Sequence, residues 1–182
     1  YRHTDDARHK FLSYYYKGRV SFNAKDYLTA TSCYMEAEQL TDAVGDDYLT
    51  GLLYAELGRI YRLYYDYPKS LEAYQKAAEC YERADKIRHR NYMWLNQTRI
   101  YRSMNENKES QDMLQTVLTL ALENEDRMLI RNSLGDLIML YVEQQEIEKA
   151  DSLYKELLCF VDEDFGSSSY MVALTKMYLS IG

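Results

Sequence analysis

The fold is decided by residues 55–81, AELGRIYRLYYDYPKSLEAYQKAAECY, because a similar stretch stands forty residues earlier. The earlier stretch is residues 14–37, YYYKGRVSFNAKDYLTATSCYMEA, and the two align when Gly18 is placed on Gly58. The same step continues through the chain without insertion or deletion, so small, aromatic or apolar, and acidic residues recur in columns. These columns are Ala30, Ser70, Ser110 and Ala150; Tyr34, Tyr74, Leu114 and Tyr154; and Asp26, Asp66, Glu106 and Glu146. Self-similarity at a fixed period indicates a repeat architecture.

Each forty-residue unit is predicted to form two helices joined by a turn. In the second unit, apolar residues spaced by three and four form two stripes, as one face of a helix requires. The two stripes are Tyr54, Leu57 and Tyr61, and then Leu71, Tyr74, Ala77, Ala78 and Tyr81. Between them, Asp66 suits a helix N-cap and Pro68 suits the first helical turn. The unit is therefore a helix–turn–helix hairpin.

Composition excludes several classes of protein. The 182 residues include 22 basic and 29 acidic side chains, and the net charge of −7 argues against binding of nucleic acid or an anionic membrane. A hydrophobic fraction of 47% supports a core, and a single Pro with seven Gly disfavours an all-β fold. The longest nearly apolar stretches, such as 113–122, are too short to span a bilayer. The sequence thus predicts an all-α protein with no membrane span in this segment.

The units resemble the tetratricopeptide repeat family, whose signature joins a Leu-Gly pair and an aromatic residue on the first helix to a small residue and an aromatic on the second. The second unit matches at Leu57, Gly58, Tyr61, Ser70 and Tyr74, whereas the third and fourth units depart at Thr98 and Ile138. The period of forty also exceeds the usual spacing of about 34. The resemblance implies one right-handed α-solenoid over 1–182, with repeats at 5–44, 45–87, 88–125 and 126–165 and a further first helix over 166–182.

The resemblance also implies a binding surface. In this family the first helices line a concave groove, and residues flanking the Leu-Gly pair face it. Transferred to this chain, the candidate partner-binding residues are Tyr15, Arg19, Asn23, Arg59, Arg62, Tyr92, Arg99 and Arg102. Five of them form two arginine columns, and the planar guanidinium fork suits carboxylates. The family's chaperone-type carboxylate clamp is not expected, because Tyr15 and Arg19 stand where its first Lys and Asn would be.

Two interpretations of the arginine columns stay open. Arginines in a protein of net negative charge indicate a groove that recognises an acidic or extended segment. Alternatively, carboxylates of the chain neutralise them, and Glu56, one helical turn from Arg59, is the nearest partner in sequence.

Catalysis and metal binding find no support in the sequence. His3, His9 and His89 are scattered, and no cysteine pair has the spacing of a zinc site, so no cofactor is predicted. The cysteines, Cys33, Cys80 and Cys159, lie on predicted second helices and are expected to be buried, inert thiols. Most of the twenty tyrosines occupy repeat columns, which favours packing over a dedicated aromatic site built from Tyr14, Tyr15 and Tyr16.

The sequence therefore predicts a non-catalytic module that binds a protein or peptide in its groove, with terminal hairpins on which a second copy would stack. The alternative function is a ligand-sensing or regulatory segment of a larger bacterial signalling protein or transcriptional regulator. The chain begins at Tyr1 and ends within a predicted helix, so we expect a longer parent protein. Its compartment, cytoplasmic or periplasmic, is left open.

Overall fold

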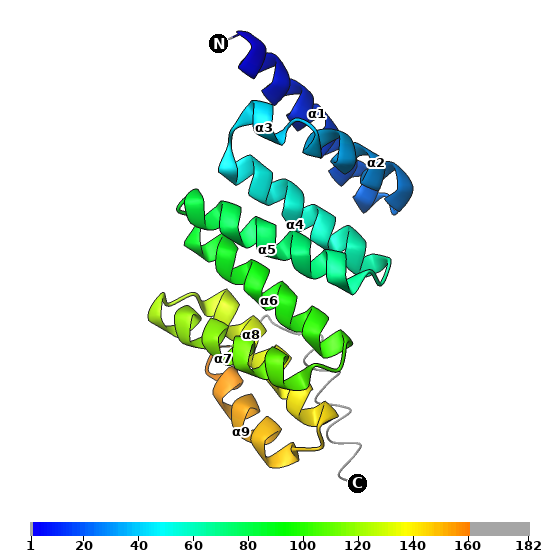
Figure 1. The fold of residues 1–182 in the computed structure, drawn as a ribbon. Coiled ribbons are helices and arrows are strands. Elements are labelled where there is room, and N and C mark those ends of the chain that lie inside the picture. Colours follow the sequence, from blue (N-terminus) through cyan, green and yellow to red (C-terminus); the bar gives the residue numbers. More distant parts are fainter. Residues whose placement is uncertain (1, 161–182) are drawn as a thin grey trace. The chain divides into compact units, whose positions relative to one another are not determined.

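The computed structural model describes residues 2–160, with side chains from Asp6 onward. The regular structure in this range is helical: α1 (Arg2–Asn23), α2 (Tyr27–Glu38), α3 (Thr41–Val44), α4 (Asp47–Leu63), α5 (Tyr67–Arg83), α6 (Ile87–Ser103), α7 (Asn107–Glu123), α8 (Arg127–Glu143) and α9 (Ile147–Leu158). The prediction of an all-α array of helical hairpins is confirmed for these residues (Figure 1). The predicted terminal helix at 166–182 lies outside them.

The chain divides into two compact units. Unit 1 runs to Ile100 and holds α1 to α5 with most of α6, and unit 2 starts at Tyr101 and holds the end of α6 with α7, α8 and α9. The predicted single array with its four repeat bounds stays a prediction. No helix within residues 2–160 combines the length and the apolar character that crossing a bilayer requires.

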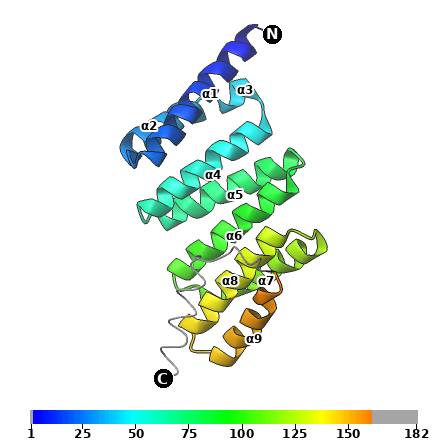
Figure 2. The same ribbon diagram turned by 180° about the vertical axis from the view of Figure 1, so that it is seen from behind.

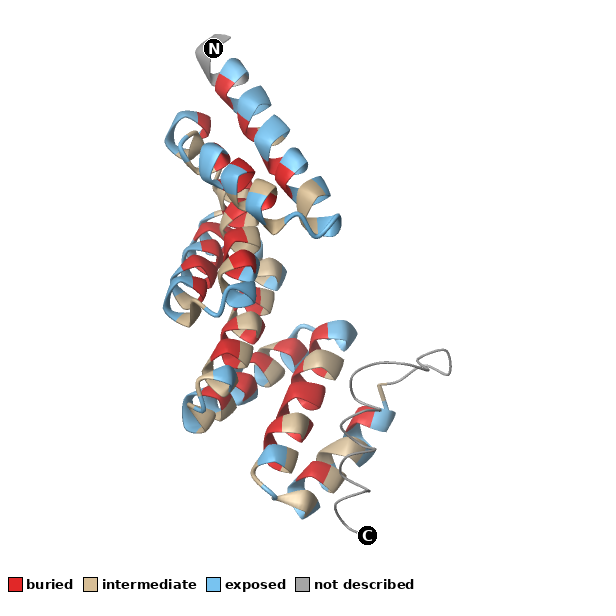
Figure 3. Ribbon diagram, turned by 90° about the vertical axis from the view of Figure 1, so that its right-hand side faces the viewer, coloured by how far each residue is buried: buried red, intermediate tan, exposed pale blue. Residues whose placement is uncertain are grey.

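Unit 1 is built from two antiparallel hairpins, α1 with α2 and α4 with α5 (Figures 1 and 2). The short helix α3 follows α2 and packs against α1. Buried side chains occupy the helix faces that meet each other, and exposed side chains cover the rest (Figure 3). The fully buried members include Phe11, Tyr34, Leu53, Leu57 and Ile60. In unit 2, α8 contacts both α7 and α9, and its buried side chains include Leu134, Leu137 and Leu140.

Glycine lets the two helices of each unit 1 hairpin approach closely. A Cβ atom at Gly18 would stand 2.5 Å from the ring of Tyr34, and one at Gly58 would stand 2.7 Å from the ring of Tyr74. Both distances are shorter than any real Cβ contact, so the aromatic column packs directly on the helix backbone at these glycines. Ser70, in the small column, donates a hydrogen bond from Oγ to the carbonyl oxygen of Gly58 at 2.8 Å. Gly18, Gly58 and Ser70 therefore lie where the two helices of a hairpin meet.

The turns share one backbone conformation at a period of twenty residues. A residue with φ between 52° and 63° lies in the turn before each of the helices α2 and α4 to α9, whereas the turn between α2 and α3 lacks one. These residues are Lys25, Gly45, Tyr65, Asp85, Asn105, Glu125 and Gln145. After most of these positions the next backbone N–H bonds the carbonyl five residues back, as from Asp66 to Tyr61 at 2.9 Å. This left-handed conformation favours glycine, yet glycine occupies it only at Gly45 within residues 2–160. The period of forty seen in the sequence thus consists of two helix-plus-turn segments of twenty residues.

The acidic column provides helix caps in two of its four members. The side chains of Asp26 and Asp66 accept hydrogen bonds from the backbone N–H three residues on, at 3.1 and 3.3 Å. Glu106 and Glu146 occupy the same N-cap position without such a bond. The extra methylene of glutamate moves its carboxylate away from the N–H groups that an aspartate reaches.

Candidate functional site

The arginine columns of unit 1 centre on Arg59 of α4. Its guanidinium carbon lies 4.3 Å from the centre of the Phe22 ring, which α1 supplies near its C-terminal end. Its Nη1 atom donates a hydrogen bond of 2.8 Å to Oε2 of Glu56, one turn earlier on α4. The Arg59 side chain remains 44% exposed, whereas that of Glu56 is only 13% exposed. Arg59 is thus in contact with an aromatic ring and a mostly buried carboxylate, while 44% of its side chain stays exposed.

Tyr15 and Tyr34 meet where α1 packs against α2, and the charge of Glu56 acts on the pKa values of both. The Tyr15 ring of α1 is 6.2 Å from the Tyr34 ring of α2, and the guanidinium carbon of Arg19 is 5.8 Å from the centre of the Tyr15 ring. Burial, together with the negative charge of Glu56, raises the pKa of Tyr15 to about 12. The same two causes raise the pKa of Tyr34 further, and the charges of Arg59 and Arg19 oppose the rise. Both phenols therefore stay neutral and can act as hydrogen-bond donors.

The remaining predicted residues of α1 and α4 lie in different surroundings. Asn23 is exposed at the last position of α1. Burial raises the pKa of Tyr74, and the positive charge of the exposed Arg62 opposes the rise. Tyr15 is only 3% exposed, so its ring forms the floor beneath Arg19 rather than an open contact surface.

The predicted residues of α6 are half-buried. Arg88 stacks on Tyr92 with its guanidinium carbon 5.8 Å from the ring centre, and Arg90 stacks on Trp94 at 4.4 Å. Arg99 is partly exposed on the same helix. The cation–π contacts of Arg88 and Arg90 were not predicted from the sequence, although both arginines precede an aromatic residue by four positions, the spacing at which helical side chains meet.

In unit 2, carboxylates of α8 neutralise Arg102. Its Nη1 atom lies 3.9 Å from Oδ1 of Asp136, and its Nε atom lies 3.8 Å from Oε2 of Glu143. These partners were not predicted from the sequence, although a signal was present. Asp136 occupies the same repeat position as Glu56, eighty residues later, so a carboxylate beside the arginines recurs in the alignment. Arg102 therefore fits the interpretation that carboxylates of the chain neutralise the columns. Arg59 is paired with Glu56, but 44% of its side chain stays exposed.

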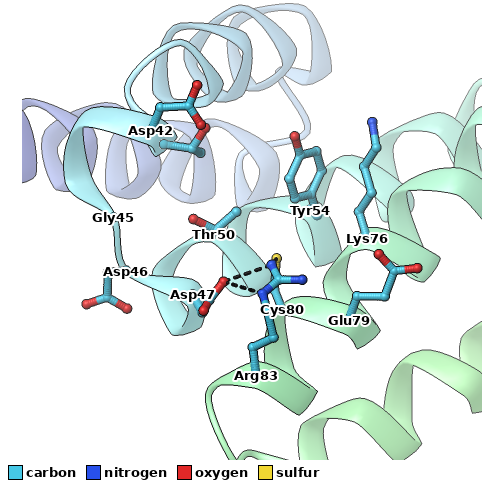
Figure 4. A pocket seen from close by; sticks show the side chains of 11 residues that line it. Asp42, Gly45, Asp46, Asp47, Thr50, Tyr54, Lys76, Glu79, Cys80 and Arg83 are labelled. Atoms are coloured by element: carbon cyan, nitrogen blue, oxygen red, sulfur yellow. Dashed lines mark hydrogen bonds and ion pairs between the residues drawn. The ribbon is translucent and has the colours of Figure 1, made fainter.

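An open pocket of about 520 Å³ lies elsewhere on unit 1, between α3, α4 and α5 (Figure 4). Its charges are largely satisfied by the chain itself. Arg83 donates from Nε to Oδ1 of Asp47 at 2.9 Å and from Nη2 to the sulfur of Cys80 at 3.1 Å. Arg8 pairs with Asp46 at 2.9 Å. The pocket lining comprises Thr41, Asp42, Gly45, Asp46, Asp47, Thr50, Tyr54, Lys76, Glu79, Cys80 and Arg83.

The expectations for tyrosines and cysteines have mixed outcomes. Tyr14 and Tyr16 are 36% and 55% exposed while Tyr15 between them is buried, so the three do not share one open surface. Cys33 and Cys80 are buried, and burial raises the pKa of the Cys80 thiol, which keeps it protonated. The expectation is wrong for Cys159, which is exposed because it follows the last turn of α9 rather than facing α8. No group of three metal-ligating side chains occurs among the side chains that the structure describes.

Comparisons with known proteins extend these observations. No protein-family model matches the chain, and no curated protein matches it in sequence. The apo form of RapI matches in structure with a TM-score of 0.84 over 94% of this chain, at 18% identity. BtubC (BKLC) from P. vanneervenii matches with a TM-score of 0.75 over 100% of this chain and 84% of its own, at 15% identity.

This likeness shows the fold. The chain is an all-α helical repeat. At 18% and 15% identity, the two structures are compared with it for fold alone. It spans 63% of the length of RapI, so it corresponds to a part of that chain.

Proposed function

We propose that this chain is a tetratricopeptide-like interaction module whose first helices in unit 1 bind an acidic, extended segment of a partner protein. The observation that carries the proposal is the environment of Arg59. A guanidinium held against Phe22 at 4.3 Å and left 44% exposed loses little side-chain entropy when it binds a carboxylate. Arg19, stacked on Tyr15, supplies a second positive charge on α1.

The local charge supports an anionic ligand. Glu56 offsets one of the two arginines, so the Arg19, Glu56 and Arg59 set keeps a net positive charge inside a chain of net charge −7. A hydrogen bond between an arginine and a carboxylate contributes about 1.5–3 kcal/mol when both are shielded from water. Two such contacts would anchor a short segment. The other side chains of the first helices would contribute shape complementarity to it.

A pull-down from lysate tests this function. Wild type is compared with an Arg19→Ala/Arg59→Ala variant, and Arg83→Ala is the matched control because Arg83 also pairs with a carboxylate but lies on the second helix of its hairpin. After equal helicity has been verified by circular dichroism, we expect a partner that wild type and Arg83→Ala retain and the double variant loses. A partner retained equally by all three proteins would place recognition outside the arginine columns.

The regulatory alternative concerns the same surface. A helical repeat that corresponds to part of a longer chain suits a sensing segment of a signalling protein. Fusion partners encoded beside this segment would distinguish the two, because a regulatory segment is joined to an effector domain and a stand-alone module is not.

A further inference from the structure

Helix α2 carries two large apolar side chains on its exposed side. Leu28 is 80% exposed and Met35 is 52% exposed. They stand seven residues apart, which is about two helical turns, so both lie on one face of the helix. Tyr64, the C-cap residue of α4, joins them at the edge of an open hollow of about 440 Å³. The hollow is lined by Leu28, Thr31, Ser32, Met35, Glu36 and Tyr64.

The other repeats show that folding does not require apolar residues at the positions of Leu28 and Met35. In the repeat alignment, the residues equivalent to Leu28 are Pro68, Lys108 and Glu148, and those equivalent to Met35 are Gln75, Gln115 and Lys155. All six are exposed. Both positions therefore face solvent in every repeat, and only the first repeat fills both with large apolar side chains. An exposed apolar cluster of this kind indicates a contact surface.

Charges of opposite sign stand at the two ends of this cluster. Lys25 precedes α2, and Glu36 lies in its last turn. Both side chains are exposed, and neither forms a hydrogen bond or an ion pair within the part of the chain that the structure describes. Asp26, next to Lys25, is engaged as the N-cap and accepts a hydrogen bond from the Thr29 N–H at 3.1 Å. The helix dipole adds to the same asymmetry, because it is positive at the Lys25 end and negative at the Glu36 end.

We propose that this surface joins two copies of the chain through their α2 helices, which pair in antiparallel fashion. We call it the α2 patch, and it consists of Leu28, Thr31, Ser32, Met35 and Tyr64. A twofold axis that passes between Thr31 and Ser32 places Leu28 of each copy against Met35 of the other. Such an interface is self-complementary, because the same residues serve on both sides. None of these residues belongs to the arginine columns, so the inference does not depend on the proposed function.

The charges favour the antiparallel arrangement over the parallel one. In an antiparallel pair, Lys25 of each copy comes beside Glu36 of the other, so two pairs of opposite charge form. In a parallel pair, Lys25 would meet Lys25 and Glu36 would meet Glu36, and like charges repel. One face of a 12-residue helix is small for a permanent interface, so we expect a dimer that forms at high concentration and dissociates on dilution.

Sedimentation equilibrium of the full chain, loaded at concentrations from about 1 μM to about 1 mM, tests the α2 patch. Wild type is expected to pass from monomer to dimer within this range. Leu28→Glu/Met35→Glu is expected to raise the dimer dissociation constant at least about tenfold, because it buries like charges against each other. Lys108→Glu/Gln115→Glu, which changes the same two positions on α7, is the matched control and is expected to dimerise as wild type does. Circular dichroism verifies that all three proteins are equally helical.

Charge reversal tests the antiparallel arrangement. Lys25→Glu and Glu36→Lys are each expected to raise the dissociation constant about threefold, and the double variant is expected to restore the wild-type value. Lys25→Glu keeps the turn, because Glu125 adopts the same left-handed conformation elsewhere in the chain.

Three results would overturn the proposal. A wild type that stays monomeric throughout the range would mean that another protein or another segment of the chain covers the α2 patch. A dimer that Leu28→Glu/Met35→Glu leaves intact would lie on a different face. A double charge variant that associates no better than the two single variants would exclude the antiparallel pairing of α2.

Discussion

At the scale of single residues, the turns place non-glycine residues in a left-handed backbone conformation that favours glycine. Lys25 has φ of 63° and its side chain is exposed, whereas Gly45 has φ of 60° and no atom lies within 4 Å of the position that a Cβ would take. Substitutions at these two positions therefore report the cost of the left-handed backbone conformation without a contribution from side-chain packing. They form a reciprocal pair for measurement.

Replacing Lys25 with glycine is expected to stabilise the protein, and replacing Gly45 with alanine to destabilise it. A non-glycine residue in the left-handed region costs about 1 kcal/mol, partly offset in the first variant by the extra freedom that glycine gives the unfolded chain. Urea unfolding at equilibrium measures both. If both substitutions shifted the midpoint in the same direction, strain at these turns would not be the cause.

At the scale of elements, the hairpin of α4 and α5 depends on one aromatic column. Tyr74 is 1% exposed and its ring lies against Gly58, so truncating it leaves a cavity between two helices that cannot close without moving. Glycine and tyrosine recur together in the repeat alignment, as Gly18 with Tyr34 and Gly58 with Tyr74, but their direct contact within one hairpin is seen only in the structure.

We expect Tyr74→Ala to lower the free energy of unfolding by about 3–5 kcal/mol, the range for loss of a buried aromatic side chain. Tyr64→Ala is the matched control, since Tyr64 is 47% exposed at the end of α4 and should lose far less. Thermal or urea unfolding measures the difference. A loss below about 1 kcal/mol for Tyr74→Ala would mean that the site collapses without a cavity.

The candidate site was less predictable than these elements. The alignment predicts which residues share a helix face, and this was sufficient to associate Glu56 with Arg59. It does not indicate how deeply a carboxylate is buried, so the 13% exposure of Glu56 and the isolated hydroxyl of Tyr34 required three-dimensional information. The pairing of Arg102 with Asp136 and Glu143 involves separate helices and equally required the fold.

At the scale of the whole molecule, the division into two compact units predicts local responses to damage. In repeat proteins each hairpin contacts its neighbours, and stability is a sum of local terms. Leu53 of α4 is fully buried within unit 1, among side chains of α1, α2 and α5.

Leu53→Ala is therefore expected to speed hydrogen exchange of backbone amides in α4 and α5 while leaving the amides of α8 and α9 as protected as in wild type. Mass-spectrometric hydrogen exchange under native conditions measures both regions in one experiment. Leu140→Ala, at a fully buried position of α8, is the reciprocal control. An equal loss of protection throughout the chain would show that it unfolds as one cooperative body.

The left-handed residue at every twentieth position has a consequence for how this protein can change in length. Gly45 and Asp85 adopt nearly the same φ, 60° and 55°, at equivalent junctions between one hairpin and the next. A chain that lost or gained the intervening forty residues would rejoin at a backbone conformation that the turn already accepts. Duplication or deletion of whole hairpins would therefore leave the φ angle at the splice point almost unchanged.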